Sequence, residues 1–264
     1  MRNARKRSDS FSLTKWYLDC VTGGGEVTIV YGTELNWRGI RLVANSVLTG
    51  SKDDVETRTS ISPYQITQAG SRITVEIPKQ GVTGEWEADS AACERVVYAA
   101  KPGSVNWKCL QPRSRVRLRL NGRELSGLGY AESTTLTVPP WKLPLHQLRW
   151  GRFVSPGNWM VWVDWKGPYN ASFAIADGKE CATPAIGETG VATCDATLCI
   201  DSGFALRAGR IGSTIMPHVP AIRTLLPRSL FKIEERKWCS AGEMRTQSNC
   251  STGWVIHEVV HWKV

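Results

Sequence analysis

The side chains best suited to acid–base chemistry lie in short apolar segments that are rich in tryptophan. A carboxylic acid surrounded by apolar groups is desolvated, which raises its pKa and lets it protonate an alkene near neutral pH. Indole faces nearby attract a positive charge that develops during such a reaction. The catalytic candidates are Glu132, Glu258, Asp164 and Tyr130. The candidates for binding a substrate are Trp16, Tyr17, Trp150, Arg152, Trp162, Trp254 and His257.

Residues 127–153 contain four of these candidates. As a strand, residues 127–132 place Tyr130 and Glu132 on one face, and the other face carries only glycine and alanine. A face of small residues lets a bulky group approach the sheet closely. Trp150 and Arg152 likewise share one face of a second strand. Two interpretations of Arg152 stay open: it acts at the site, or it forms a buried structural ion pair with Glu132.

The segment His257-Glu258-Val-Val-His261 matches the HExxH motif of zinc proteases. That motif requires a helix to bring both histidines to the metal, whereas this segment alternates with period two and is rich in valine, which is typical of a strand. We therefore predict no metal. Glu258 shares its strand face with two tryptophans, one of them Trp254. It is either an acid in an apolar pocket or a structural partner of an arginine.

Residues 159–165 form a second tryptophan-rich strand, with Trp162 and Asp164 on one face and a third tryptophan opposite. An aspartate among aromatic rings can stabilise a carbocation, although a tryptophan-rich strand is more often packed core. The first hairpin has a similar mixture, with Tyr17 on one face of a strand and Trp16 on the other. Both segments are candidate walls of an apolar pocket.

Composition and charge argue against several classes of protein. The 264 residues carry 33 basic and 24 acidic side chains. Residues 1–10 are strongly basic, and we expect them to be a disordered tail. The remaining excess charge is too small to predict nucleic-acid binding. No apolar stretch follows the basic start, so no signal peptide is predicted. A cytoplasmic location is expected, with the eight cysteines as free thiols.

Motifs for nucleotides and flavins are not found. The sequence contains no Walker loop, no GxGxxG before a helix and no GxSxG elbow. The three glycines at 23–25 join two strands and predict a turn. Residues 113–119 alternate arginine with other residues, which favours a solvated outer strand face. We therefore predict that the protein works without a cofactor.

Short β-branched and aromatic runs separated by turn signals predict an all-β fold. The expected strands are residues 15–21, 27–31, 38–47, 73–77, 105–109, 116–120, 136–138, 148–154, 159–165, 171–175, 205–207 and 254–262. Residues 52–61 are polar and are expected to be a loop. This spacing is typical of an antiparallel barrel or sandwich. It does not distinguish two barrels from one long twisted sheet.

The segment Gly127-Leu-Gly-Tyr-Ala-Glu132, followed by Trp150-Gly-Arg152, resembles the carotenoid hydratase (hydroxyneurosporene synthase) family, whose lipocalin-like relatives include pericyclic cyclases. The resemblance implies two antiparallel lipocalin-like (calycin) barrels packed together with little helix, formed by residues 11–128 and 129–264. Where relatives place a histidine or asparagine close after the acid, this chain has Ser133 and Thr134.

The resemblance also implies cofactor-independent acid–base chemistry on a hydrophobic polyene, terpenoid or polyketide, in carotenoid or natural-product biosynthesis. In a hydration, isomerisation or cyclisation of this kind, a protonated Glu132 or Glu258 would donate to a double bond. Asp164 and indole faces would stabilise the cation, and Tyr130 or Arg152 would orient substrate or water. One alternative is a non-catalytic lipocalin-like carrier of an apolar ligand. Another is peripheral attachment to a membrane surface through the basic tail and the arginine-rich strand.

Overall fold

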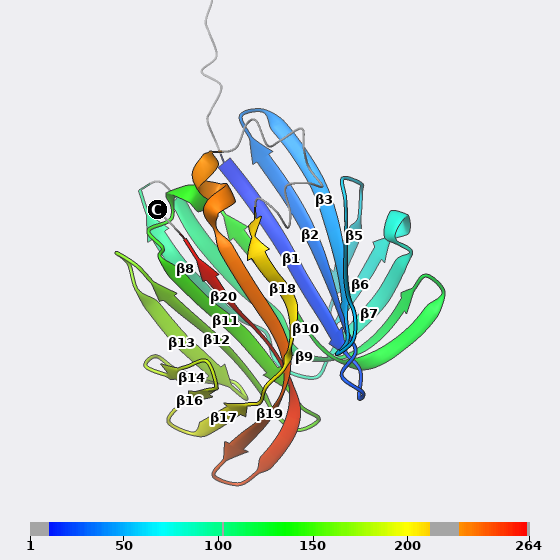
Figure 1. Ribbon diagram of the computed structural model, residues 1–264, viewed down its shortest axis with the longest axis vertical. Helices are drawn as coiled ribbons and strands as arrows, with labels where there is room; N and C mark the ends of the chain where they lie inside the picture. Colours follow the sequence, from blue (N-terminus) through cyan, green and yellow to red (C-terminus); the bar gives the residue numbers. More distant parts are fainter. Residues whose placement is uncertain (1–10, 102, 212–226, 263–264) are drawn as a thin grey trace, which may run out of the picture.

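The computed structural model describes residues 11–101, 103–211 and 227–262, and it consists almost entirely of antiparallel β-strands (Figure 1). The predicted all-β class is therefore confirmed. The expected basic tail, residues 1–10, lies outside the described residues. No helix in these ranges has the length and apolar character needed to cross a membrane. All eight cysteines fall within them, and each is a free thiol.

The first sheet is formed by the first ten strands, in the order β4-β3-β2-β1-β10-β9-β7-β6-β5, with β8 also paired to β9. Their bounds are β1 (Phe11–Val21), β2 (Val27–Trp37), β3 (Ile40–Gly50), β4 (Val55–Ser60), β5 (Gln65–Ala69), β6 (Arg72–Ile77), β7 (Val82–Ala88), β8 (Cys93–Ala100), β9 (Gly103–Leu120) and β10 (Arg123–Leu136). A 3₁₀ turn, η1 (Pro78–Gln80), joins β6 to β7.

The second sheet repeats this arrangement, in the order β14-β13-β12-β11-β20-β19-β17-β16-β15, with β18 paired to β19. Its strands are β11 (Gln147–Val154), β12 (Trp159–Lys166), β13 (Ala171–Ala176), β14 (Lys179–Cys181), β15 (Ala185–Ile186), β16 (Gly190–Ala192), β17 (Ala196–Ile200), β18 (Phe204–Arg210), β19 (Glu234–Thr246) and β20 (Cys250–His261). Two 3₁₀ turns, η2 (Pro140–Lys142) and η4 (Arg228–Lys232), lie outside the sheets. The chain passes from the first sheet to the second through residues 137–146.

One expected loop is a strand. Residues 52–61 contain β4, which pairs with β3 in an antiparallel register from Asn45 opposite Ser60 to Gly50 opposite Val55. The prediction was wrong because this strand lies at the edge of the sheet, where polar and charged side chains are favoured on both faces. Its sequence therefore lacks the apolar alternation that identifies an inner strand.

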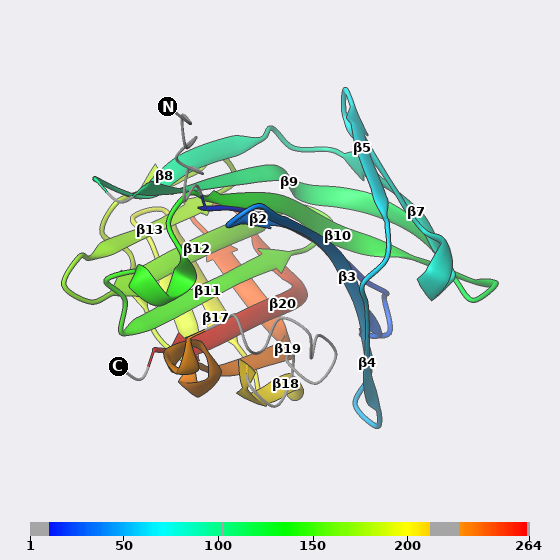
Figure 2. The same cartoon turned by 90° about the horizontal axis from the view of Figure 1, so that it is seen from above.

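The two sheets face each other and share a core. Figure 2 shows β9 and β10 running above β11 and β12, with β3 and β4 bending down beside the second sheet. A large cluster of buried residues contains side chains from both sheets, and each sheet carries a second cluster on its other face. Central strands such as β12 are consequently buried on both faces, which is why residues 159–165 are almost continuously apolar.

A buried ion pair joins the two sheets at the centre of this shared core. Arg152 on β11 donates from Nε and Nη2 to the two carboxylate oxygens of Asp19 on β1, at 2.9 and 2.7 Å. Its Nη1 donates to the carbonyl oxygen of Trp254 at 2.7 Å. Both charged side chains have 0% exposure. The expected alternative of an ion pair between Arg152 and Glu132 is therefore wrong, because the guanidinium is fully engaged by Asp19 and Trp254.

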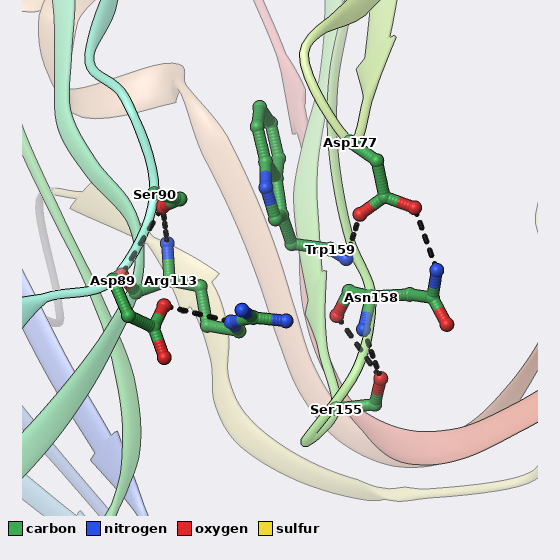
Figure 3. A network of polar contacts seen from close by, with 7 residues as sticks. All are labelled: Asp89, Ser90, Arg113, Ser155, Asn158, Trp159 and Asp177. Carbon is green, nitrogen blue, oxygen red and sulfur yellow. Dashed lines mark hydrogen bonds and ion pairs between the residues drawn. The ribbon is translucent and has the colours of Figure 1, made fainter.

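Polar contacts also hold the loops beside Trp159, at the start of β12 (Figure 3). On one side of this tryptophan, Arg113 donates from Nε to Asp89 at 2.7 Å. On the other, Asp177 accepts hydrogen bonds from the backbone N–H of Trp159 at 2.8 Å and from the amide of Asn158 at 2.6 Å. The first network belongs to the first sheet and the second network to the second sheet, so Trp159 is fixed where the two meet.

We expect Arg152→Met to lower the free energy of unfolding by about 3–5 kcal/mol, because it leaves the Asp19 carboxylate buried without its partner. The double variant Asp19→Leu/Arg152→Met removes both charges and should lose less than the Arg152→Met variant. Urea unfolding followed by tryptophan fluorescence measures each value. A single variant as stable as the wild type would show that this pair does not hold the sheets together.

Candidate active site

A cavity of about 450 Å³ lies between the two sheets. Strands β1, β2, β3 and β10 of the first sheet form one wall, and β11, β19 and β20 of the second sheet form much of the other. Most lining side chains are apolar. The charged ones are Lys15, Glu132, Arg207, Glu235, Lys237 and Glu258. An apolar hollow with a few converging polar groups is the usual form of a small-molecule site.

The register of the first sheet arranges this wall in rows across β3, β2, β1 and β10. One row is apolar and consists of Leu42, Leu35, Leu13 and Leu136. The next consists of Ala44, Thr33, Lys15 and Thr134, and the one after it of Ser46, Tyr31, Tyr17 and Glu132. Because directly opposed residues in antiparallel strands point to the same face, all three rows line the cavity.

Glu132 is held by three hydrogen-bond donors on one of its oxygens. Its Oε2 accepts from the Tyr130 hydroxyl at 2.6 Å, from Trp107 Nε1 at 2.5 Å and from Trp150 Nε1 at 3.2 Å. Burial raises the pKa of Glu132, and the charge of Glu258 adds to that effect, although Tyr130 and Trp107 oppose it. With Oε2 acting as acceptor, the proton of the neutral acid belongs on Oε1.

Glu258 lies in the opposite electrostatic situation. Its Oε2 is 2.7 Å from Nζ of Lys237, which also donates to the Tyr31 hydroxyl at 2.9 Å. Burial alone would raise the pKa of Glu258, but the ammonium of Lys237, with smaller contributions from Lys15 and Arg207, outweighs this effect and holds the pKa below its usual value. Of the two interpretations of this residue, the structure supports the ion pair, with a lysine in place of the expected arginine.

Lys237 is enclosed by aromatic rings and carboxylates. Its Nζ lies 5.1, 5.3 and 5.7 Å from the ring centroids of Tyr17, Tyr31 and Trp150. Burial alone would lower its pKa, but Glu258, Tyr31 and Glu235 outweigh this effect and raise it. Both shifts favour the charged forms, so Lys237 and Glu258 form an ion pair. Among the described acids that line the cavity, Glu132 is the one whose pKa is raised.

Several predicted residues meet at this place. Tyr17, Glu132, Trp150 and Glu258 line the cavity. Tyr130 lies one row deeper, fully buried, and reaches Glu132 through its hydroxyl. The three rings of Tyr17, Tyr130 and Trp150 contact one another edge to face, with centroids 5.1 to 6.0 Å apart. The residues that were expected to carry the chemistry at 130, 132 and 258 thus converge from both sheets.

Arg152 does not line the cavity, because it is buried in the ion pair with Asp19. Five other predicted residues also lie outside the cavity: Trp16, Trp162, Asp164, Trp254 and His257. Trp162 packs in the core on the other face of the second sheet, and Asp164 shares that strand face with it. Trp16 packs on the other face of the first sheet. Trp254 lies over the turn at Gly25, where a Cβ would collide with the indole. The expected role of Asp164 beside a carbocation in this cavity is therefore wrong.

His257 also points away from the cavity, because its neighbour Glu258 faces it. The imidazole stacks on Trp238, with ring centroids 5.2 Å apart. Segment 257–261 is part of strand β20, so the helix that the HExxH motif requires is not formed. Burial lowers the pKa of His257 to about 4, and the charge of Arg149 contributes.

The prediction from sequence missed Lys237, Tyr31, Trp107 and Arg207. Lys237 belongs to β19, whose buried face carries Glu235, Lys237 and Cys239. Charged residues on both faces made this segment resemble a solvated one, and no strand was expected there. The signal available was the pair Trp238 and Cys239 directly after four charged residues. Trp107 and Tyr31 lay in strands that were expected, but nothing local shows that their polar atoms reach residues on other strands.

No family profile matches the chain, and no curated protein is detectably similar to it in sequence. Solved structures do match. A Nitrosomonas europaea protein assigned to AttH has a TM-score of 0.60 and 10% identity, covering 96% of this chain and 94% of its own. The chain shares its fold.

Two further structures have the same architecture. CghA in complex with Sch210972 matches with a TM-score of 0.56 and 10% identity, covering 96% of this chain and 89% of that one. Kievitone hydratase from Nectria haematococca matches with a TM-score of 0.55 and 11% identity, covering 96% and 90%. The fold implied by the resemblance to carotenoid hydratases, with two lipocalin-like units, is therefore confirmed.

Glu132 and Glu258 should affect the pH dependence of stability in opposite directions. The pKa of Glu132 is raised in the folded protein, so ionisation of Glu132 costs stability as pH rises above about 4.3, its unfolded value. The pKa of Glu258 is lowered, so its contribution is present above that value and is lost as pH falls. Urea unfolding of Glu132→Gln and Glu258→Gln from pH 4 to 7 should give differences from wild type with opposite slopes.

His257 gives a separate prediction. Because its pKa falls from about 6.5 to about 4 on folding, the wild type should lose stability as pH falls through this window. The variant His257→Gln should show a smaller loss between pH 6.5 and 4. His261→Gln, on the same face but exposed, is the matched control and should follow the wild type. Identical pH profiles for the wild type and His257→Gln would contradict this prediction.

Proposed function

We propose that the protein is a cofactor-independent enzyme that uses Glu132 as a general acid to hydrate, isomerise or cyclise a hydrophobic alkene. The observation that carries this proposal is the environment of Glu132: a half-buried acid with a raised pKa, fixed through Oε2 by three donors and lining an apolar cavity. A neutral acid near pH 7 is what protonation of carbon requires.

The first step transfers the Oε1 proton of Glu132 to one carbon of the double bond, whose π electrons form the new C–H bond. The other carbon becomes cationic. The rings of Tyr17 and Trp150 stabilise this charge through cation–π attraction, and the fixed carboxylate of Glu258 stabilises it electrostatically. Glu132 is left as a carboxylate whose Oε2 keeps its hydrogen bonds to Tyr130 and the two indoles.

The second step restores the proton to Glu132 and determines the product. In a hydration, water forms a C–O bond with the cation and gives up a proton to the carboxylate. In an isomerisation, the carboxylate takes a proton from a neighbouring carbon, and that C–H pair becomes the new double bond. In a cyclisation, a second double bond of the substrate attacks the cation before a proton is lost. Each sequence leaves the enzyme unchanged.

We assign the substrate to polyenes, terpenoids or polyketides of carotenoid or other natural-product biosynthesis. The apolar row of leucines and the aromatic rings suit a long unsaturated hydrocarbon. Kievitone hydratase, which has this fold, is named for a hydration, and CghA has been crystallised with Sch210972. These likenesses support the proposal through the fold alone, at 10 to 11% identity.

A carrier of an apolar ligand is the second candidate, since a cavity between sheets can bind without chemistry. Desolvating a carboxylic acid is unfavourable, and a carrier gains nothing from two such groups beside its ligand. Glu132 and Glu258 both line this cavity. Their presence favours an enzyme over a carrier.

The proposal predicts that Glu132→Gln lowers kcat by about 10²- to 10⁴-fold, because glutamine keeps the shape but has no acidic proton. The protein would be incubated in D₂O with a panel of hydrophobic polyenes, and products would be analysed by mass spectrometry. Addition of D₂O indicates hydration, and gain of a single deuterium indicates isomerisation or cyclisation.

Glu124→Gln is the matched control for this experiment. Glu124 lies on the same strand, β10, but is exposed and paired with Arg119, so its loss should leave turnover unchanged. Full activity of a folded Glu132→Gln protein would rule out the mechanism. Tight binding of a polyene without deuterium uptake by the wild type would favour the carrier.

A further inference from the structure

We propose that Lys15, Thr33 and Thr134 form a subsite for an anionic group of the ligand, such as a carboxylate or an ionised acidic enol. The proposal deepens the function given above and rests on it for the identity of the cavity as a substrate site. It identifies the ligand as amphipathic: an unsaturated apolar body that carries one acidic group.

The three residues form a polar row across adjacent strands of the cavity wall. Lys15 on β1 lies directly opposite Thr33 on β2 and Thr134 on β10. All three side chains line the cavity. An ammonium flanked by two hydroxyls offers several donors on one small area, which is the arrangement that an oxyanion requires.

The charges of the cavity leave Lys15 as the available cation. Lys237 is neutralised by Glu258 at 2.7 Å, and Arg207 is neutralised by Glu235 at 3.3 Å. No ion pair of Lys15 is found among the described residues. Its charge still reaches the acids, since it lowers the pKa of both Glu132 and Glu258, although more weakly than their closer partners.

Lys15 is exposed and lines the cavity, so its ammonium is accessible to a ligand that enters from solvent. On its strand face it lies between Leu13 and Tyr17, both of which also line the cavity. Both threonine hydroxyls are likewise without a hydrogen-bond partner in the part of the chain that the structure describes. Three polar groups with free donors, placed together on the wall of an apolar cavity, match a ligand that supplies the acceptor.

The position of this subsite relative to Glu132 limits where the reacting double bond lies. The polar row is one same-face step, two residues, from the row of Tyr17 and Glu132. Such a step is about 7 Å along a strand. A ligand whose acidic group contacts Lys15 therefore has its double bond several bonds away when that bond lies at Glu132. The apolar row at Leu13 and Leu35, on the other side, would contact the rest of the molecule.

The experiment compares two matched fluorescent probes, trans-parinaric acid and its methyl ester. Both carry the same conjugated tetraene, and they differ in the negative charge at pH 7.5. We expect the wild type to bind the acid at least about tenfold more tightly than the ester, as measured by probe fluorescence. Lys15→Met should remove this preference by weakening binding of the acid alone, and Lys15→Arg should retain it.

The threonines and a distant lysine provide further variants. Thr33→Val and Thr134→Val should each weaken binding of the acid by a few fold and leave the ester unchanged. Lys52→Met, in the exposed turn between β3 and β4, should behave as the wild type. Equal affinity of the wild type for acid and ester, or equal weakening of both by Lys15→Met, would overturn the subsite.

Repeating the titrations with Glu132→Gln separates this proposal from the proposed reaction. Because glutamine does not change the row at Lys15, the preference for the acid should persist in that variant. A preference for the acid that depends on Lys15, together with full turnover by Glu132→Gln, would keep the subsite and reject the catalytic mechanism. Turnover that depends on Glu132, with no preference for the acid, would do the reverse.

Discussion

The ion pair between Asp19 and Arg152 is the interaction on which the arrangement of the site depends. It connects β1 of one sheet to β11 of the other, and its two parallel hydrogen bonds allow only one alignment of these strands. Buried pairs of this kind contribute more to the choice of a single arrangement than to stability, in the proteins where that role has been established. Here the alignment brings the row of Tyr17 and Glu132 opposite the row of Trp150 and Glu258.

This alignment gives two carboxyl groups of similar intrinsic acidity different roles. Glu132 faces neutral donors, so burial dominates and favours the protonated form. Glu258 faces Lys237, so the charged partner dominates and favours the ionised form. One group can therefore give a proton while the other keeps a fixed negative charge nearby, and no metal or organic cofactor is needed to explain the difference. The separation of the two pKa values results from the burial of Glu132 and from the ammonium of Lys237 on β19 beside Glu258.

The sequence predicted the strands around the site and the shared faces within each strand. Tyr130 with Glu132, and Glu258 with Trp254, share faces as period-two alternation requires. The same alternation could not show which face lines the cavity, because β1 and β12 are apolar on both sides. Trp16, Trp162 and Asp164 were therefore expected in a cavity that they do not line. Asp19 and Arg152 are 133 residues apart, and no local pattern indicates that they meet. Lys237 was missed because the partners that offset its desolvation, Glu258 and Tyr31, lie on other strands. No local pattern in the sequence indicates such partners.

The enclosure of Lys237 has a consequence for chemical labelling. A lysine amine forms an imine with an aldehyde or ketone only when its nitrogen has a lone pair, and the partners of Lys237 keep that nitrogen protonated. The protein therefore contains a lysine beside its candidate acid that is unsuited to covalent catalysis through a Schiff base. We therefore expect that aldehyde reagents, and carbonyl groups on a natural ligand, do not react with this nitrogen, which stays positively charged.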